Sequence, residues 1–190
     1  MAILKIATIG HPVLREVARE VSREELASDD VQGFIDDLVE TMVDANGAGL
    51  AANQVYRPIR VCAIWVKDNP RYPYKPNYPL TILVNPKLET SGLLFDNYEG
   101  CLSVPNLRGV APRFAHVRVR AWDRHGKDVD LDVKGLTAGT FQHECDHLDG
   151  KVFLDRVADT RTLTTWADFE RYHLAGFAES ARAIVAKYGS

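Results

Sequence analysis

Apolar side chains in residues 29–45 recur at the spacing of an α-helix. They follow one another at every fourth position, as on one face of a helix that packs on a core: Phe34, Leu38 and Met42. Asp29 or Asp30 can cap the first turn, and the Asn46-Gly47 pair favours the end of the helix. The pattern therefore predicts one amphipathic helix, followed by a loop over residues 47–54.

The middle of the chain has the apolar and β-branched runs of extended strands. Residues 59–66 and 80–84 predict two strands. Between them, residues 68–79 hold four prolines and three tyrosines, which predicts a surface loop, an inserted excursion rather than a binding element. Apolar positions alternate in residues 116–122 and return in residues 129–133. The glycine-containing segment 123–127 separates these two runs, so we expect a β-hairpin.

Helical patterns return in the last third of the chain. Residues 136–148 predict a helix, with Gly150 in C-cap position, and residues 162–188 predict another, interrupted near Gly176. This order is neither a regular βαβ alternation nor all-β. It predicts an α+β fold of mainly antiparallel strands packed around a central helix, with a C-terminal helix. A length of 190 residues fits a single domain over residues 1–190.

The composition is that of an ordinary globular protein. Hydrophobic residues make up 46% and charged residues 26% of the chain. The net charge of -3 argues against direct nucleic-acid binding, and no apolar run is long enough to span a membrane. Three cysteines suit a reducing compartment, and the first residues resemble neither a signal peptide nor a transit segment. We expect a cytoplasmic protein of bacterial type, although a processed organellar chain would look the same.

The helix predicted over residues 136–148 contains an H-E-x-x-H motif. His143 and His147 lie one helical turn apart, so both imidazoles can bind one metal ion. Glu144 would lie beside that ion and could move a proton to or from a bound water. A catalytic metal site usually takes three protein ligands, and Cys101 in the segment E-G-C-L-S is the natural third.

Three other readings remain open at this point. A zinc peptidase would use Glu170 as the third ligand. A cysteine hydrolase would use Cys101 as the nucleophile and His143 as the base. A non-catalytic module would keep the fold without the reaction. The remaining cysteines, Cys62 and Cys145, are expected to fill the core.

Three segments resemble the signatures of the peptide deformylase family, and they occur in the family's order. Residues 47–54 (GAGLAANQ) resemble G-x-G-L-A-A-x-Q, residues 99–103 match E-G-C-L-S, and residues 142–147 match Q-H-E-x-D-H. His11 with Pro12, and Asn85 with Pro86, also resemble family segments. The resemblance extends from about residue 10 to about residue 156.

The resemblance implies a metal-dependent hydrolase of similar fold. Its substrates would be N-formylmethionyl nascent peptides, from which it releases formate. One divalent ion, Fe²⁺ with Zn²⁺, Ni²⁺ or Co²⁺ as substitutes, would be held by Cys101, His143 and His147. Glu144 would transfer the proton. The Gln54 amide and the Leu102 backbone N–H would stabilise the oxyanion. The resemblance also suggests a monomer and a transient contact with the ribosome.

The resemblance further implies how the peptide is bound. Its backbone would pair with Gly47, Ala48, Gly49 and Leu50 and with Gly100 in strand-like fashion. Its methionine side chain would enter an apolar pocket formed by Ala48, Leu136, Gly139, Thr140 and His143. Ala48 and Gly139 are smaller than usual for the family, so we expect a more open pocket and looser selectivity for methionine. Glu99 is expected to anchor its loop, and Arg108 to reach a substrate carbonyl.

Overall fold

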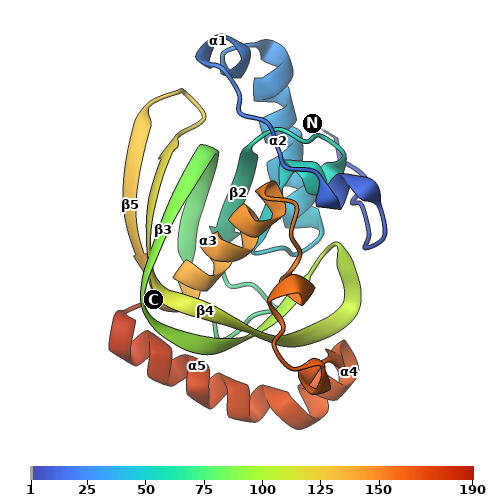
Figure 1. The fold of residues 1–190 in the computed structure, drawn as a ribbon, viewed down its shortest axis with the longest axis vertical. Coiled ribbons are helices and arrows are strands. Elements are labelled where there is room, and N and C mark those ends of the chain that lie inside the picture. Colours follow the sequence, from blue (N-terminus) through green and yellow to red (C-terminus); the bar gives the residue numbers. More distant parts are fainter. Residues whose placement is uncertain (1) are drawn as a thin grey trace.

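One antiparallel sheet organises the chain (Figure 1). The computed structural model describes residues 2–190, so Met1 of the expected 1–190 domain lies outside the described residues. The strands are β1 (Gly49–Ala51), β2 (Val61–Val66), β3 (Tyr78–Cys101), β4 (Val104–Trp122), β5 (Asp128–Lys134) and β6 (Thr164–Thr165). The sheet order is β1-β2-β3-β4-β5, with β6 paired to β4.

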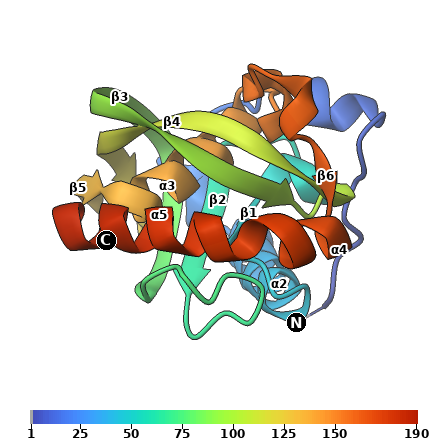
Figure 2. The same ribbon diagram turned by 90° about the horizontal axis from the view of Figure 1, so that it is seen from below.

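The helices lie on both faces of the sheet and across one end of it (Figures 1 and 2). They are α1 (Arg23–Leu26), α2 (Asp29–Asp44), α3 (Gly135–Leu148), α4 (Trp166–Asp168) and α5 (Leu174–Tyr188), with a π-helical turn over Phe169–His173. Short 3-10 turns cover Pro12–Arg15, Ala52–Val55, Phe153–Arg156 and Thr160–Thr162. Helix α3 lies at the centre, with the curved strands around it. The expected α+β class is therefore confirmed.

Strand β2 is buried on both sides because it lies between two helices. Val61 and Ala63 join the core formed with α2, whereas Cys62 and Ile64 join the core formed with Phe141 of α3. Side chains of a strand alternate between its two faces, so both sets of positions must be apolar. This explains the unbroken apolar run that predicted the strand.

Local patterns placed α2, α3 and the β4–β5 hairpin close to their observed bounds. Helix α2 is capped by Ser28, whose Oγ accepts from Val31 N, rather than by the expected Asp29 or Asp30. The hairpin turn is held by Asp123, whose carboxylate accepts from the backbone N–H groups of His125 and Lys127.

Two strand predictions need correction. Residues 47–54 are not wholly a loop, because Gly49–Ala51 pairs with Cys62–Ile64 and buries Leu50. The predicted strand 80–84 is only the start of β3, which continues to Cys101 through a register shift between Ser91 and Leu94. Strands β3 and β4 form one long hairpin, and Cys101 lies at its tip opposite Val104.

The C-terminal segment also differs from the predicted helix with an interruption near Gly176. Thr164–Thr165 pairs with Leu107–Arg108 of β4, and the irregularity is the π-helical turn rather than Gly176, which lies inside α5. The turn brings Phe169 and His173 onto the ring of Tyr98. Within residues 2–190, the structure contains no helix with the length and apolarity that a bilayer span requires.

Candidate metal centre and substrate pocket

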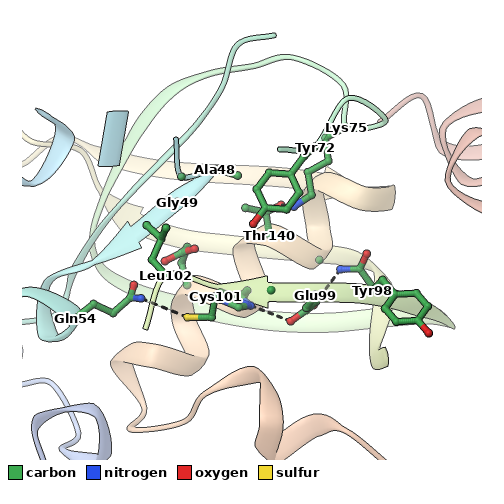
Figure 3. A pocket seen from close by; sticks show the side chains of 16 residues that line it. Ala48, Gly49, Gln54, Tyr72, Lys75, Tyr98, Glu99, Cys101, Leu102 and Thr140 are labelled. Atoms are coloured by element: carbon green, nitrogen blue, oxygen red, sulfur yellow. Dashed lines mark hydrogen bonds and ion pairs between the residues drawn. The ribbon is translucent and has the colours of Figure 1, made fainter. Parts of the chain in front are cut away.

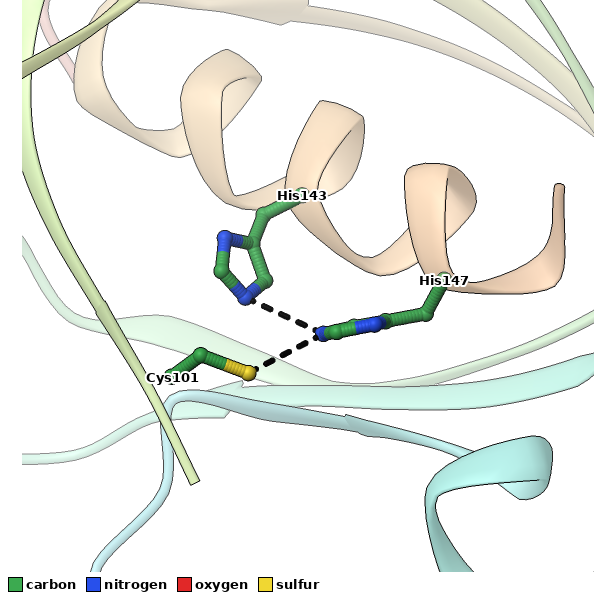
Figure 4. A group of neighbouring side chains, drawn as sticks. All are labelled: Cys101, His143 and His147. Carbon is green, nitrogen blue, oxygen red and sulfur yellow. Dashed lines mark hydrogen bonds between the residues drawn. The ribbon is translucent and has the colours of Figure 1, made fainter. Parts of the chain in front are cut away.

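Three side chains converge between the tip of the β3–β4 hairpin and helix α3 (Figure 4). The Cys101 Sγ lies 3.2 Å from the Nε2 of His147, which lies 3.3 Å from the Nε2 of His143. Cys101 and His147 are buried, and His143 faces the pocket. The two histidines converge because they occupy positions i and i+4 on one face of the helix.

The spacing of these atoms fits a metal ion. Bonds of about 2.0–2.3 Å at tetrahedral angles would place ligand atoms about 3.3–3.6 Å apart, close to the observed distances. The chemistry of the donors fits as well, because one thiolate and two imidazoles suit iron, cobalt, nickel or zinc. Burial by itself would raise the pKa of the Cys101 thiol, but His147 and His143 hold that pKa well below its usual range. The thiolate is the form that binds metals.

A buried charge network orients His143. The Nδ1 of His143 lies 2.8 Å from an oxygen of Glu99. Arg113 donates to both oxygens of Glu99, at 2.7 and 2.8 Å, and to Asp146, at 2.6 Å. Burial alone would raise the pKa of Glu99, but Arg113 and His143 hold it far below its usual range. A carboxylate on Nδ1 leaves Nε2 free to act as a ligand.

Glu144 is buried and closely packed beside the cluster. One of its oxygens has no hydrogen-bond donor within residues 2–190, and burial raises the pKa of the carboxyl group. A Cβ on Gly49 would overlap this carboxylate. Glycine at position 49 therefore allows β1 to pass directly against Glu144.

Gln54 is fixed against the same cluster. Its Oε1 accepts from Ala51 N at 2.9 Å, and its amide nitrogen lies 3.5 Å from Cys101 Sγ and 3.0 Å from Ser103 Oγ (Figure 3). Leu102 lies between Cys101 and Ser103 at the hairpin tip and lines the pocket. The two predicted oxyanion donors thus come from separate segments that meet at Cys101.

Most of the predicted substrate-binding residues line one pocket beside the cluster (Figure 3). These are Gly47, Ala48, Gly49, Gly100, Gly139 and Thr140. Tyr72 and Lys75 of the loop between β2 and β3 also line this pocket, whose free volume is about 40 Å³. The loop is therefore part of the pocket, contrary to the sequence interpretation.

Four predicted residues lie elsewhere, and one of them is Leu50, which is fully buried in the core that α2 covers. Leu136 is fully buried and is not among the residues that line the pocket. Arg108 is also fully buried, and it donates to the Tyr74 hydroxyl and the Tyr98 carbonyl rather than pointing into the pocket. Glu170, the alternative third ligand, accepts from Trp166 Nε1 and is not part of the three-residue cluster.

Sequence reasoning missed several residues of the site. Arg113 joins Glu99 to Asp146 across two elements, and Lys75 and Asn97 line the pocket. Asp146 lies in the same motif as the two histidines, so the motif could have marked it as a residue of the site. The other three depend on contacts between distant segments, so no local pattern marks them.

Comparison with known proteins gives a consistent result. The model of the polypeptide deformylase family matches residues 3–162. Peptide deformylase 2 of Bordetella bronchiseptica is 42% identical over 159 residues, which cover 83% of this chain and 88% of the relative. Peptide deformylase 1 of Prochlorococcus marinus is 42% identical over 173 residues, which cover 90% of this chain and 88% of that relative.

Solved structures agree with the sequence comparisons. A class I type b peptide deformylase from Acinetobacter baumannii, bound to Met-Ala-Ser, has a TM-score of 0.79 at 38% identity, covering 82% of this chain and 99% of that one. A peptide deformylase from Synechococcus elongatus in complex with actinonin has a TM-score of 0.74 at 31% identity, and the match covers 98% of this chain and 86% of that one. The chain therefore belongs to the polypeptide deformylase family and is an enzyme of that class.

Proposed function

We propose that this chain is a metal-dependent hydrolase that removes the formyl group from N-formylmethionyl nascent peptides and releases formate. The observation that carries the proposal is the convergence of one thiolate and two imidazoles beside a buried carboxylate, at the inner end of a pocket. Its membership of the deformylase family supports the same reaction.

Cys101, His143 and His147 would hold one divalent ion, for which we propose Fe²⁺, with Zn²⁺, Ni²⁺ or Co²⁺ as substitutes. When bound, the ion supplies Lewis acidity that lowers the pKa of water toward neutrality. Glu99 and Arg113 fix the ring of His143 and so keep its Nε2 directed at the cluster.

Glu144 would act as general base and acid. Its raised pKa and its unpaired oxygen suit a group that accepts a proton from water and later delivers it to the leaving amine. The Gln54 amide and the Leu102 N–H would stabilise the charge that develops on the carbonyl oxygen. Loss of one such donor typically slows a reaction by about 10²–10³-fold.

The peptide would lie along Gly47, Ala48, Gly49 and Gly100, with its first side chain directed toward Gly139 and Thr140. The Met-Ala-Ser peptide in the related Acinetobacter structure supports a peptide substrate. Leu136, which is buried and does not line the pocket, would lie behind this wall.

We further propose that residues 1–190 act as one catalytic domain, as a monomer in a cytoplasm of bacterial type. A contact with the ribosome would be transient and would involve no direct nucleic-acid binding. The net charge of -3 supports this last point.

The direct test is formate release from formyl-Met-Ala-Ser by protein purified without air. Release should disappear on chelation and in Glu144→Ala, whereas that variant should still bind metal. Release that survives chelation would instead favour Cys101 as a nucleophile. Metal binding without any release would leave a non-catalytic module.

A further inference from the structure

The pocket beside the metal centre contains an ammonium group without a carboxylate partner. Lys75 reaches in from the loop between β2 and β3, and its Nζ donates to Thr140 Oγ1 at 2.9 Å (Figure 3). The nitrogen also lies 5.0 Å from the centroid of the Tyr72 ring. An ammonium has three donors, and within residues 2–190 only Thr140 accepts from this one.

The acidic side chains of the pocket are already engaged. Both oxygens of Glu99 are taken by Arg113, and they are shared with His143 and Asn97. Glu144 belongs to the proposed proton transfer. The charge on Lys75 is therefore partly buried and has no ion pair among residues 2–190, an arrangement that costs free energy unless an acceptor is supplied. Burial lowers the pKa of Lys75 to about 8.

A second polar atom in the pocket wall also lacks a partner. Asn97 is 2% exposed, and its amide nitrogen donates to Glu99 at 3.0 Å. Its Oδ1 has no hydrogen-bond donor within residues 2–190. The donor contact to Glu99 fixes the orientation of the amide, so this oxygen is available to an occupant of the pocket. Lys75 and Asn97 thus give the wall a donor and an acceptor that a methionine thioether, which is only a weak acceptor, does not fully satisfy.

We propose that Lys75 is a specificity-determining residue that lets the pocket proposed for the methionine side chain also hold a first side chain that ends in an oxygen acceptor. This inference rests on the proposed function, in which that side chain enters toward Gly139 and Thr140. Formyl peptides that begin with glutamate or glutamine are then substrates as well as those that begin with methionine or with norleucine, which has a similar length but no acceptor. The glutamate and glutamine arms distinguish a need for negative charge from a need for an oxygen alone.

The test compares kcat/KM for formyl-X-Ala-Ser, with X as glutamate, glutamine or norleucine, in the metal-loaded enzyme and its variants. Lys75→Met should lower kcat/KM for glutamate and glutamine by about ten- to hundredfold and spare norleucine, because a charged hydrogen bond is lost. Lys75→Arg keeps the donors and should keep the activity on the glutamate and glutamine peptides. Lys67→Met removes the same charge from an exposed position near the start of the loop, and it should change none of the ratios.

Calorimetric binding of the deformylated peptides X-Ala-Ser gives a readout that does not need the reaction. The glutamate and glutamine peptides should bind more weakly to Lys75→Met than to the unmodified enzyme, whereas binding of the norleucine peptide should not change. An equal ratio of glutamate to norleucine in the unmodified enzyme and in Lys75→Met would overturn the assignment. No formate release from any peptide, with a Lys75-dependent binding order, would overturn the proposed reaction and support the role of Lys75.

Discussion

At the scale of single residues, the centre depends on one buried arginine. Arg113 is 2% exposed and joins Glu99, which orients His143, to Asp146 on the metal-binding helix. Arg113 lies between the two buried carboxylates and neutralises both, and Arg156 gives Asp146 a second partner. Arg113 thus links the stability of the fold to the position of a ligand.

Arg113→Met should lower the free energy of unfolding by about 3–5 kcal/mol, since it leaves Glu99 buried without its arginine, whereas Asp146 keeps Arg156. Urea denaturation measures this change. Arg118→Met is the matched control on the same strand, because Arg118 pairs with Asp130 at the surface and should cost less than about 1 kcal/mol. Equal costs for the two variants would contradict the assigned role.

Gly49→Ala should reduce kcat by about 10²-fold, because the new Cβ must displace the Glu144 carboxylate. Steady-state kinetics with a formyl peptide would measure the loss. Gly33→Ala in α2 is the control, since nothing lies within 4 Å of its added Cβ. That control should keep full activity. If Gly49→Ala were equally active, Glu144 could not be as tightly held as the structure has it.

Lys75 should make stability depend on pH. Its pKa is about 8 in the folded chain against an ordinary 10.5, through burial and the cations Arg108 and Arg113, opposed by Glu99 and Glu144. Between these pH values the unfolded chain binds the proton that the folded chain has lost. Stability should therefore rise with pH over this window. Lys75→Met should show a weaker rise when unfolding free energies at pH 8 and pH 10 are compared. An unchanged slope would argue against a buried ammonium.

At the scale of elements, aromatic rings of the C-terminal segment hold the pocket loop in place. The ring of Tyr72 lies 6.2 Å from that of Trp166, and Tyr74 lies 4.9 Å from Phe177 of α5. Arg108 of β4 also donates to the Tyr74 hydroxyl. The position of Lys75 thus depends on packing that begins about a hundred residues later in the chain.

Phe177→Ala should loosen this loop, since a buried ring is lost from its contact with Tyr74. Amide hydrogen exchange should become faster at Lys75, whose N–H donates to the Tyr72 carbonyl. Tyr172→Ala serves as the control, because Tyr172 is 64% exposed in the same segment. Comparable exchange rates in the two variants would show that the ring contacts do not hold the loop.

Elements with long local patterns could be predicted from the sequence, and the others could not. Helix α3 and the β4–β5 hairpin have regular periodicity or turn residues of their own. Strand β1 has only three residues, and β3 extends through exposed Leu93 and Leu94, so neither has a readable pattern. Within the site, sequence motifs predicted the three metal ligands. Lys75 reaches the neighbouring pocket only through tertiary packing, which no motif marks.

At the scale of the whole molecule, the chain consists of a family core and a segment that completes it. The family model ends at residue 162, yet Trp166, Phe169 and Phe177 all lie against Arg108 or Tyr74. The same segment returns to the metal-binding helix, since the Ser190 carbonyl accepts from Leu136 N at 3.0 Å. The C-terminal segment therefore contacts both the pocket wall and the start of α3.

Chelation should lower the melting temperature of the metal-loaded protein, because a ligand bound only by the folded state stabilises it by mass action. Differential scanning calorimetry with and without chelator measures the shift. Cys101→Ala should melt at a temperature that responds much less to chelator. A shift of the same size in that variant would point to metal bound elsewhere.

The place of Cys101 at the tip of the long hairpin has a consequence for folding. Cys101 and His147 are 46 residues apart in sequence, so a bound ion cross-links two distant parts of the chain. Closing a loop of this length costs chain entropy that must be recovered from contacts formed late. The ligands should therefore come together only after the hairpin has docked on α3, and metal uptake should be among the last events as the polypeptide folds.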